Sequence, residues 1–207
     1  MPYHPGDSHW LGSAMPAPIE AIVDRDNAHA WAAAADSVDE QRGLILAGAV
    51  GAGKTTALAE IARACWKRDV AAGLWKPATS DRPYQTWLDE PFIFTTAADF
   101  CDDVKATYGW KFNGPPQLED CYTASGLGAR CRRLFLDDLG VEASTAANCQ
   151  MIVQLLHDRD ARKLPTWIST NLTRAEFAER YGSRAWDRLR ATNKLIGLLG
   201  GSRRIAV

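Results

Sequence analysis

Gly48-Ala-Val-Gly-Ala-Gly-Lys-Thr-Thr56 is the stretch of sequence that decides the fold of this chain. It matches the pattern G-x-x-x-x-G-K-[ST], in which glycines let backbone N–H groups surround a phosphate and the lysine reaches the β- and γ-phosphates. The first threonine offers its hydroxyl to Mg²⁺. The motif predicts nucleotide contacts from Gly48, Gly51, Ala52, Gly53, Lys54, Thr55 and Thr56.

The segments on either side of this loop favour the same interpretation. Residues 43–47 form an apolar run that predicts a buried strand, and residues 57–68 are typical of a helix. The helix would point its N-terminus, with its unpaired N–H groups, at the phosphates. The alternative is a glycine-rich turn that matches the motif by chance, and such a turn would have no reason to lie between a strand and a helix. We therefore expect a bound nucleoside triphosphate, ATP, with Mg²⁺.

A second informative segment is Arg133-Leu-Phe-Leu-Asp-Asp-Leu-Gly140, where apolar residues lead into two carboxylates. Ligand chemistry in an open parallel sheet gathers at the carboxyl ends of its strands. Downstream of a P-loop this is the Walker B pattern, in which Asp137 would hold Mg²⁺ together with Thr55. Asp138 would orient or polarise the attacking water. A strand that ends in a polar turn is the alternative.

A third segment, residues 165–171, also predicts a strand that ends in polar residues, here Thr170 and Asn171. Beside the phosphates, such a pair can hold the attacking water by hydrogen bonds. Thr173 and Glu176 have the spacing of a capping box and open a helix that extends to about Tyr181.

Strands and helices alternate along the chain, which predicts an α/β fold with a mostly parallel sheet covered by helices on both faces. We expect an extended proline-rich arm and lead-in helix over residues 1–40, then one ATPase domain over 41–207 with an irregular insertion at about 69–91. The remaining expected elements are strands at 92–95 and 195–199, and helices at 28–36, 97–108, 144–161 (capped by Ser144) and 183–190.

Length, charge and cysteine content limit the classes of protein to which this chain can belong. The 207 residues suit one domain, and the chain is nearly neutral, with 24 Lys/Arg and 25 Asp/Glu. Residues 151–207 nevertheless carry 11 Lys/Arg and 5 Asp/Glu, and this basic surplus could meet phosphates or form a solvated face. The five cysteines have no zinc spacing, and there is no signal peptide or long apolar run. We expect free thiols, a cytoplasmic location and no membrane association.

The order of these motifs resembles that of the AAA+ ATPases of the DnaC/IstB group, bacterial and phage helicase loaders and their transposition relatives. The similarity covers about residues 40–207. It is strongest in Arg180-Tyr-Gly-Ser-Arg-Ala-Trp-Asp-Arg-Leu-Arg190 and in Gly201-Ser-Arg-Arg204. The resemblance implies that Asn171 is the sensor-1 residue and that Arg188 is an arginine finger acting on the γ-phosphate of a neighbouring subunit. Arg184 lies four residues earlier, so both guanidinium groups can share one helix face.

This resemblance implies an ATPase that acts in DNA replication, most simply a helicase loader. Its catalytic residues would be Lys54, Asp138, Asn171 and Arg188, and its partners single-stranded DNA, a replicative helicase or a transposase, and further copies of itself. An IstB-like transposition ATPase fits the same motifs. A P-loop small-molecule kinase, with the basic C-terminal helices as a lid, is the alternative from another class.

Related initiators and loaders bind single strands through a segment between the second strand and the acidic strand. Here Lys105, Lys111, Arg130, Arg132 and Arg133 alternate with Tyr108, Trp110, Phe112 and Tyr122. Basic groups can follow phosphates while aromatic rings stack on bases. We therefore expect residues 105–133 to contribute to single-strand binding. The alternative is that these aromatic side chains are core residues, which fits Phe112 and Tyr122 slightly better than DNA binding does.

Overall fold

The structure, a computed structural model, describes residues 34, 36–37, 42–73, 92–106 and 131–199. The strands are β1 (Leu44–Gly48), β2 (Phe92–Thr96), β3 (Arg133–Leu139), β4 (Thr166–Thr170) and β5 (Lys194–Leu198). The helices are α2 (Lys54–Ala71), α4 (Ala97–Ala106), α6 (Ala146–Ala161), α7 (Arg174–Tyr181) and α8 (Ser183–Thr192).

The strands form one sheet in the order β2-β3-β4-β1-β5, and every neighbouring pair is parallel. β4 lies between the P-loop strand and the acidic strand, with Thr170 in register with Ala47 of β1 and Leu139 of β3. The carboxyl ends of β1, β4 and β3 therefore lie side by side, at one edge of the sheet. The predicted parallel α/β sheet is confirmed.

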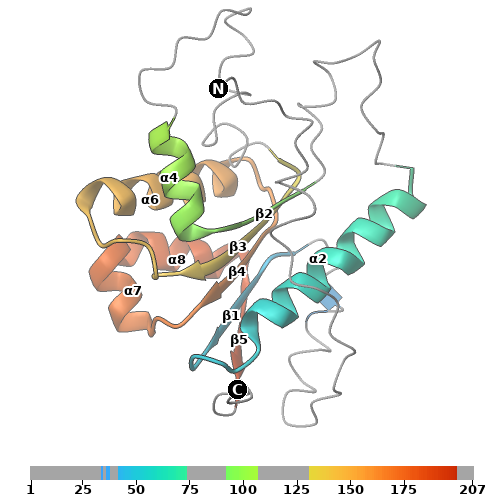
Figure 1. The fold of residues 1–207 in the computed structure, drawn as a ribbon, viewed down its shortest axis with the longest axis horizontal. Coiled ribbons are helices and arrows are strands. Elements are labelled where there is room, and N and C mark those ends of the chain that lie inside the picture. Colours follow the sequence, from blue (N-terminus) through green and yellow to red (C-terminus); the bar gives the residue numbers. More distant parts are fainter. Residues whose placement is uncertain (1–33, 35, 38–41, 74–91, 107–130, 200–207) are drawn as a thin grey trace, which may run out of the picture.

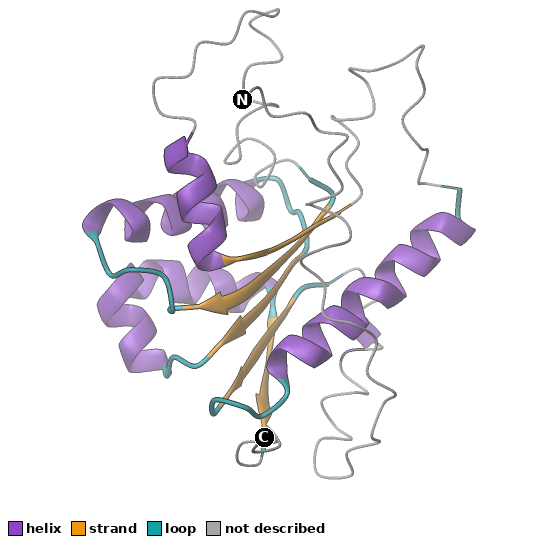
Figure 2. Cartoon of the chain, viewed as in Figure 1, coloured by secondary structure: helices purple, strands orange, loops and turns teal. Residues whose placement is uncertain are grey.

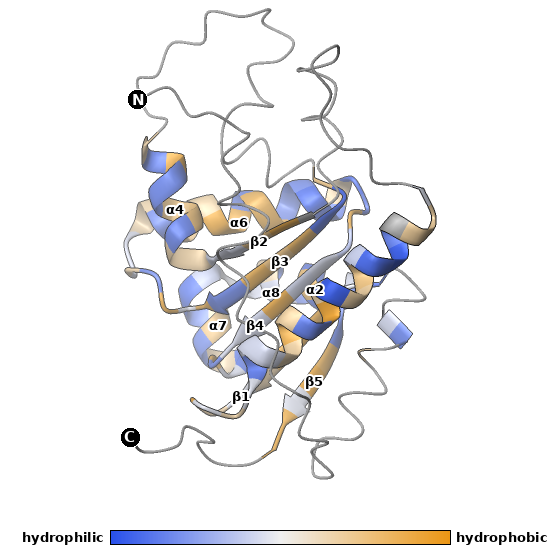
Figure 3. Ribbon diagram, turned by 45° about the vertical axis from the view of Figure 1, so that its right-hand side comes forward, coloured by the Kyte–Doolittle hydropathy of each residue, from blue (hydrophilic) through white to orange (hydrophobic). Residues whose placement is uncertain are grey.

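Helices cover both faces of the sheet, as predicted (Figures 1 and 2). α2 packs on one face, where alternate strand residues such as Leu46, Phe135 and Trp167 join its buried side chains. α4, α6, α7 and α8 cover the other face, over residues such as Ile45 and Leu136. Successive strand residues point to opposite faces, so strands buried on both sides become continuous apolar runs, which Figure 3 shows along β3.

Most predicted elements begin and end within one or two residues of the observed ones. α2 starts earlier, at Lys54, so that the P-loop lysine is already helical. The predicted cap Ser144 is wrong: Thr145 is the N-cap of α6, because its backbone is extended and its side chain accepts the Asn148 N–H. The predicted insertion begins inside α2, which continues to Ala71, and residues 74–91 lie outside the described residues.

The prediction that Arg133 lies on a DNA-binding surface is wrong. Its side chain is fully buried at the start of β3 and makes two hydrogen bonds to Asp69 near the end of α2, Nε–Oδ2 at 2.9 Å and Nη2–Oδ1 at 2.7 Å. The guanidinium also lies over the Trp167 ring, 5.8 Å from its centre. Arg133 is a structural residue that joins the P-loop helix to the acidic strand.

The remainder of the predicted DNA-binding surface is only partly visible. Lys105 is exposed and paired with Asp102, and Arg132 is half-buried, whereas residues 107–130 lie outside the described residues. Of the predicted lead-in helix, Ala34 and Asp36 are described and are helical, as is Ser37, which follows it. Ser37 accepts a hydrogen bond from the indole N–H of Trp167.

The four cysteines that the structure describes are free thiols, and three of them are buried. Burial raises the pKa of Cys65 and of Cys101 to about 11, so both are protonated near neutrality. Among the described helices, none is long and apolar enough to cross a bilayer.

Candidate nucleotide site

The P-loop connects β1 to α2 by a turn that requires glycine. Gly51 and Gly53 have φ values of 81° and 91°, a region that residues with a Cβ rarely adopt. The side chain of Lys54 is buried, and its ammonium donates to the carbonyl oxygens of Gly48 at 3.0 Å and Ala49 at 2.8 Å. The lysine therefore lies back over its own loop, with its charge at the centre of the loop.

Asp137 meets the P-loop threonine from across the sheet. Its carboxylate is buried and accepts a hydrogen bond from the Ser169 hydroxyl. Burial raises the pKa of the Asp137 carboxyl, and the neighbouring Asp138 adds to this effect, while the hydrogen bonds from Ser169 and Thr55 oppose it. The Thr55 side chain, predicted to share Mg²⁺ with Asp137, thus lies near enough to this carboxyl to favour its charged form.

This donor set fits magnesium. Mg²⁺ is usually bound by one or two carboxylates together with substrate phosphates and waters, rather than by an all-protein cage. Thr55 and Asp137 supply one hydroxyl and one carboxylate, and the loop supplies a place for phosphates. Within the described ranges, no group of three or more His, Cys, Asp and Glu side chains could hold a metal, so a closed zinc-type cage is absent there.

Asp138 lies at an irregular point near the end of β3, directly after Asp137, and begins the turn that leads to Val141. Its φ is +52°, and the register of β3 against β4 shifts between Leu136 and Leu139. Its N–H donates to Ser169 Oγ at 2.9 Å, and its carbonyl accepts the Val141 N–H at 3.0 Å. The turn leaves the side chain of Asp138 half-buried at the carboxyl edge of the sheet, where a base for a water molecule is expected.

β4 ends between the two motifs. Thr170 is buried, donates to the Leu139 carbonyl at 2.7 Å and accepts the Leu172 N–H at 3.1 Å. Asn171 follows as an exposed residue at the same edge of the sheet. Thr170 is thus used to hold the backbone, which leaves Asn171 as the polar side chain available to solvent and ligand.

Sequence reasoning missed two groups at this edge. One is Ser169, which bridges Asp137 and the Asp138 N–H. The other is Glu142, a buried carboxylate that accepts from the Gly140 N–H at 2.9 Å and from Arg180 and Tyr181 of α7. A serine in a strand and a glutamate in a loop carry no motif of their own, and only the spatial pairing identifies them.

Arg188 is exposed on α8 and lies far from the P-loop of its own chain. Together with Arg184 it lines a groove that also includes Thr166, the first residue of β4, and Asn193, which precedes β5. These residues lie at the amino ends of parallel strands, whereas the P-loop follows the carboxyl end of β1. The structure brings Lys54, Thr55, Asp137, Asp138 and Asn171 to one edge and leaves Arg188 apart from them.

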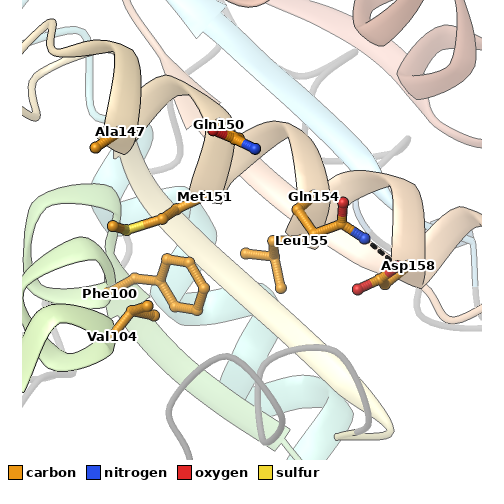
Figure 4. A pocket seen from close by; sticks show the side chains of 8 residues that line it. All are labelled: Phe100, Val104, Ala147, Gln150, Met151, Gln154, Leu155 and Asp158. Atoms are coloured by element: carbon orange, nitrogen blue, oxygen red, sulfur yellow. Dashed lines mark hydrogen bonds between the residues drawn. The ribbon is translucent and has the colours of Figure 1, made fainter. Parts of the chain in front are cut away.

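A hollow of about 320 Å³ lies between α4 and α6 (Figure 4). Phe100, Met151 and Leu155 form its apolar floor, and Gln154 donates to Asp158 at its rim at 2.7 Å. None of the predicted site residues lines it. The candidate nucleotide site therefore rests on the chemistry of its residues rather than on the volume of a cavity.

The same fold occurs in solved structures of DNA replication proteins. The DnaC helicase loader matches with a TM-score of 0.61 and 18% sequence identity over 85% of this chain and 92% of its own. DnaI matches with a TM-score of 0.62 and 21% identity over 89% of this chain and 87% of its own. AMPPCP-bound DnaA from Aquifex aeolicus gives a TM-score of 0.62 and 13% identity, over 86% of this chain and 48% of its own.

Neither a family model nor a curated protein sequence matches the chain. At these identities the structural similarity shows the fold alone, which this chain shares with the DnaC, DnaI and DnaA structures.

Proposed function

We propose that this protein is an ATP-dependent AAA+ ATPase of DNA replication, most simply a helicase loader. The observation that carries the proposal is that Thr55 of the P-loop lies close enough to Asp137 of the acidic strand to lower the pKa of that carboxyl. These residues come from elements more than 80 positions apart, and together they form the donor pair that Mg²⁺ and a triphosphate require. The solved DnaC, DnaI and DnaA structures share the fold, and one of them holds AMPPCP.

In this mechanism each residue of the site has a separate task. The P-loop N–H groups and Lys54 would hold the phosphates, and Thr55 and Asp137 would hold Mg²⁺, whose positive charge would offset that of the phosphoryl oxygens. Asp138 accepts the proton of the attacking water, and Asn171 orients that water by hydrogen bonds. Arg188 of a neighbouring subunit completes the site, because the Arg188 of the same chain lies at the other end of the sheet.

Single-stranded DNA, a replicative helicase and further copies of the chain are the proposed partners. The experiment that tests the proposal measures ATP hydrolysis with and without single-stranded DNA over a range of protein concentrations. A loader requires subunit contact, so its specific rate should rise with concentration and respond to DNA. A rate that is independent of both, and that depends on a small phosphate acceptor, would instead support a P-loop kinase.

The same assay does not distinguish a helicase loader from an IstB-like transposition ATPase, because both respond to DNA. Binding to a purified replicative helicase, measured with and without ATP, separates them. Stable ATP-dependent association supports the loader. DNA-stimulated hydrolysis without any association with the helicase supports the transposition ATPase.

A further inference from the structure

Glu142 occupies an unusual position for a carboxylate. It follows the turn that begins at Asp138, and its side chain is almost completely buried against α7. A buried charge is costly unless it is paired and hydrogen-bonded, so its partners show what it holds together. Those partners come from two sides: the backbone of the acidic turn and the C-terminal end of α7.

On the turn side, Glu142 Oε2 accepts the Gly140 N–H at 2.9 Å. Gly140 has a φ of +104°, and a Cβ at this position would come within 2.6 Å of the Leu172 side chain. Asp138 and Val141 close the same turn by a backbone hydrogen bond of 3.0 Å. The geometry of the Asp138 turn therefore depends on the place of the Glu142 carboxylate.

On the helix side, Glu142 Oε1 accepts from Arg180 Nε at 3.2 Å and Nη2 at 2.9 Å, and from the Tyr181 hydroxyl. Arg180 also donates to the Glu142 carbonyl. The guanidinium is thus bonded through two nitrogens to one carboxylate oxygen and also to the backbone carbonyl of the same residue. α7 cannot rotate without disturbing Glu142.

α7 is in turn packed on α8, the helix that carries Arg188. Phe177 of α7 lies against Tyr181 and Trp186, with ring centres 4.8 Å and 5.2 Å apart, and all three rings are buried. Only Gly182 separates the two helices in the sequence. A continuous set of contacts thus runs from Asp138 through Glu142 and Arg180 to the helix of Arg188.

We propose that Glu142 is a positioning residue that couples the Asp138 turn to α7 and α8. Nucleotide bound beside Asp138 in one subunit would then order the helix with which that same subunit presents Arg188 to its neighbour. This inference rests on the proposed nucleotide site and adds to it a link between one subunit's own site and the arginine it contributes to the next.

The test measures amide hydrogen exchange of the full chain with and without Mg²⁺ and AMPPCP, in an Arg188→Ala background that prevents a neighbour's nucleotide from ordering α8. In this background the ligand should slow exchange in the P-loop, in residues 138–142 and in residues 174–192. With Glu142→Gln added, slowing should remain in the P-loop and be lost from 174–192. Glu179→Gln, the same change at an exposed site on α7, should behave like the background.

A purely structural role for Glu142 would raise exchange equally with and without ligand and leave the ligand-dependent difference intact. That result would overturn the inference. Tyr181→Phe, which removes only one hydroxyl, serves as a milder second variant if Glu142→Gln does not fold, and it should reduce the slowing over 174–192. Absence of any ligand effect on exchange in the P-loop would overturn the proposed function and this inference together. If the ligand slows exchange in the P-loop, and adding Glu142→Gln does not change its effect on residues 174–192, the inference alone is overturned.

Discussion

Ser169 shows how a single hydroxyl organises the acidic strand. It donates to the Asp137 carboxylate and accepts the Asp138 N–H at 2.9 Å, so its one proton and one of its two lone pairs are used. The two carboxylates could be predicted from the sequence, because they follow an apolar run downstream of a P-loop. Ser169 could not, because its role depends on the register of β3 against β4 at an irregular point of the ladder.

The Ser169→Ala substitution should weaken Mg²⁺ binding without unfolding the protein. The alanine leaves the Asp137 carboxylate free to turn and leaves the Asp138 N–H without its acceptor. Loss of a group that orients a metal ligand typically costs about 10–100-fold in metal affinity or activity. The measurement is the Mg²⁺ concentration that gives half-maximal ATP hydrolysis, with Ser144→Ala in the exposed loop before α6 as control. Equal Mg²⁺ dependence in both variants would contradict the role of Ser169.

Lys54 and Asp138 should separate binding from hydrolysis. Lys54→Ala should abolish triphosphate binding, because backbone N–H groups alone cannot balance the charge of the β- and γ-phosphates. Asp138→Asn should keep binding and stop turnover, since an amide is a poor base. Asparagine tolerates a φ of +52° well, so this substitution changes the chemistry with little change in the backbone.

Fluorescent-nucleotide binding and phosphate release, measured on both variants, check this prediction. Retained hydrolysis in Lys54→Ala together with lost affinity in Asp138→Asn would be the opposite pattern and would refute the assigned roles. Thermal melting serves as the control for folding, because Lys54 also bonds two carbonyls of its own loop.

At the scale of elements, the sequence predicted most of the strands and helices because each carries a local signal. Continuous apolar runs indicated strands buried on both faces, and the capping box of Thr173 and Glu176 is present in the structure as predicted. What could not be predicted is which elements are tied together. Asp69 and Arg133 are 64 residues apart, and their pairing became visible only when α2 was packed on the sheet.

The buried pair of Asp69 and Arg133 should contribute strongly to stability. Both side chains are essentially inaccessible, and removing one partner of such a pair leaves an uncompensated buried charge, at a cost of about 3–5 kcal/mol. Asp69→Asn should lower the free energy of unfolding by that amount in denaturant titrations. Asp102→Asn removes the partner of exposed Lys105 and should cost at most about 1 kcal/mol. Similar losses in the two variants would show that the buried pair is not a major contributor.

At the scale of the whole molecule, the parallel sheet determines where chemistry can occur. The P-loop, the acidic turn and Asn171 meet at the carboxyl edge because β4 lies between β1 and β3. Motif order implied this meeting, but the sequence did not reveal the strand order that produces it. The same topology carries Arg188 toward the amino ends of β4 and β5, where it cannot serve the nucleotide of its own chain.

Arg188 should therefore act in trans. Arginine suits a γ-phosphate because its planar guanidinium makes two charge-assisted hydrogen bonds and stays protonated. An arginine finger contributes about 10³–10⁵ to the rate, so Arg188→Ala alone and Lys54→Ala alone should both be nearly inactive. Mixing them should restore hydrolysis, because the first protein supplies an intact P-loop and the second an intact arginine.

The mixture is to be compared with Arg190→Ala mixed with Lys54→Ala, because Arg190 is an exposed arginine on the same helix. Arg190→Ala should be active by itself and should gain nothing from the second protein. If the Arg188→Ala mixture stays inactive while both proteins remain folded and assemble, Arg188 does not act in trans. Since the fold separates Arg188 from the P-loop of its own chain, that result would leave it no catalytic role, and a kinase that needs no neighbouring subunit would become the better interpretation.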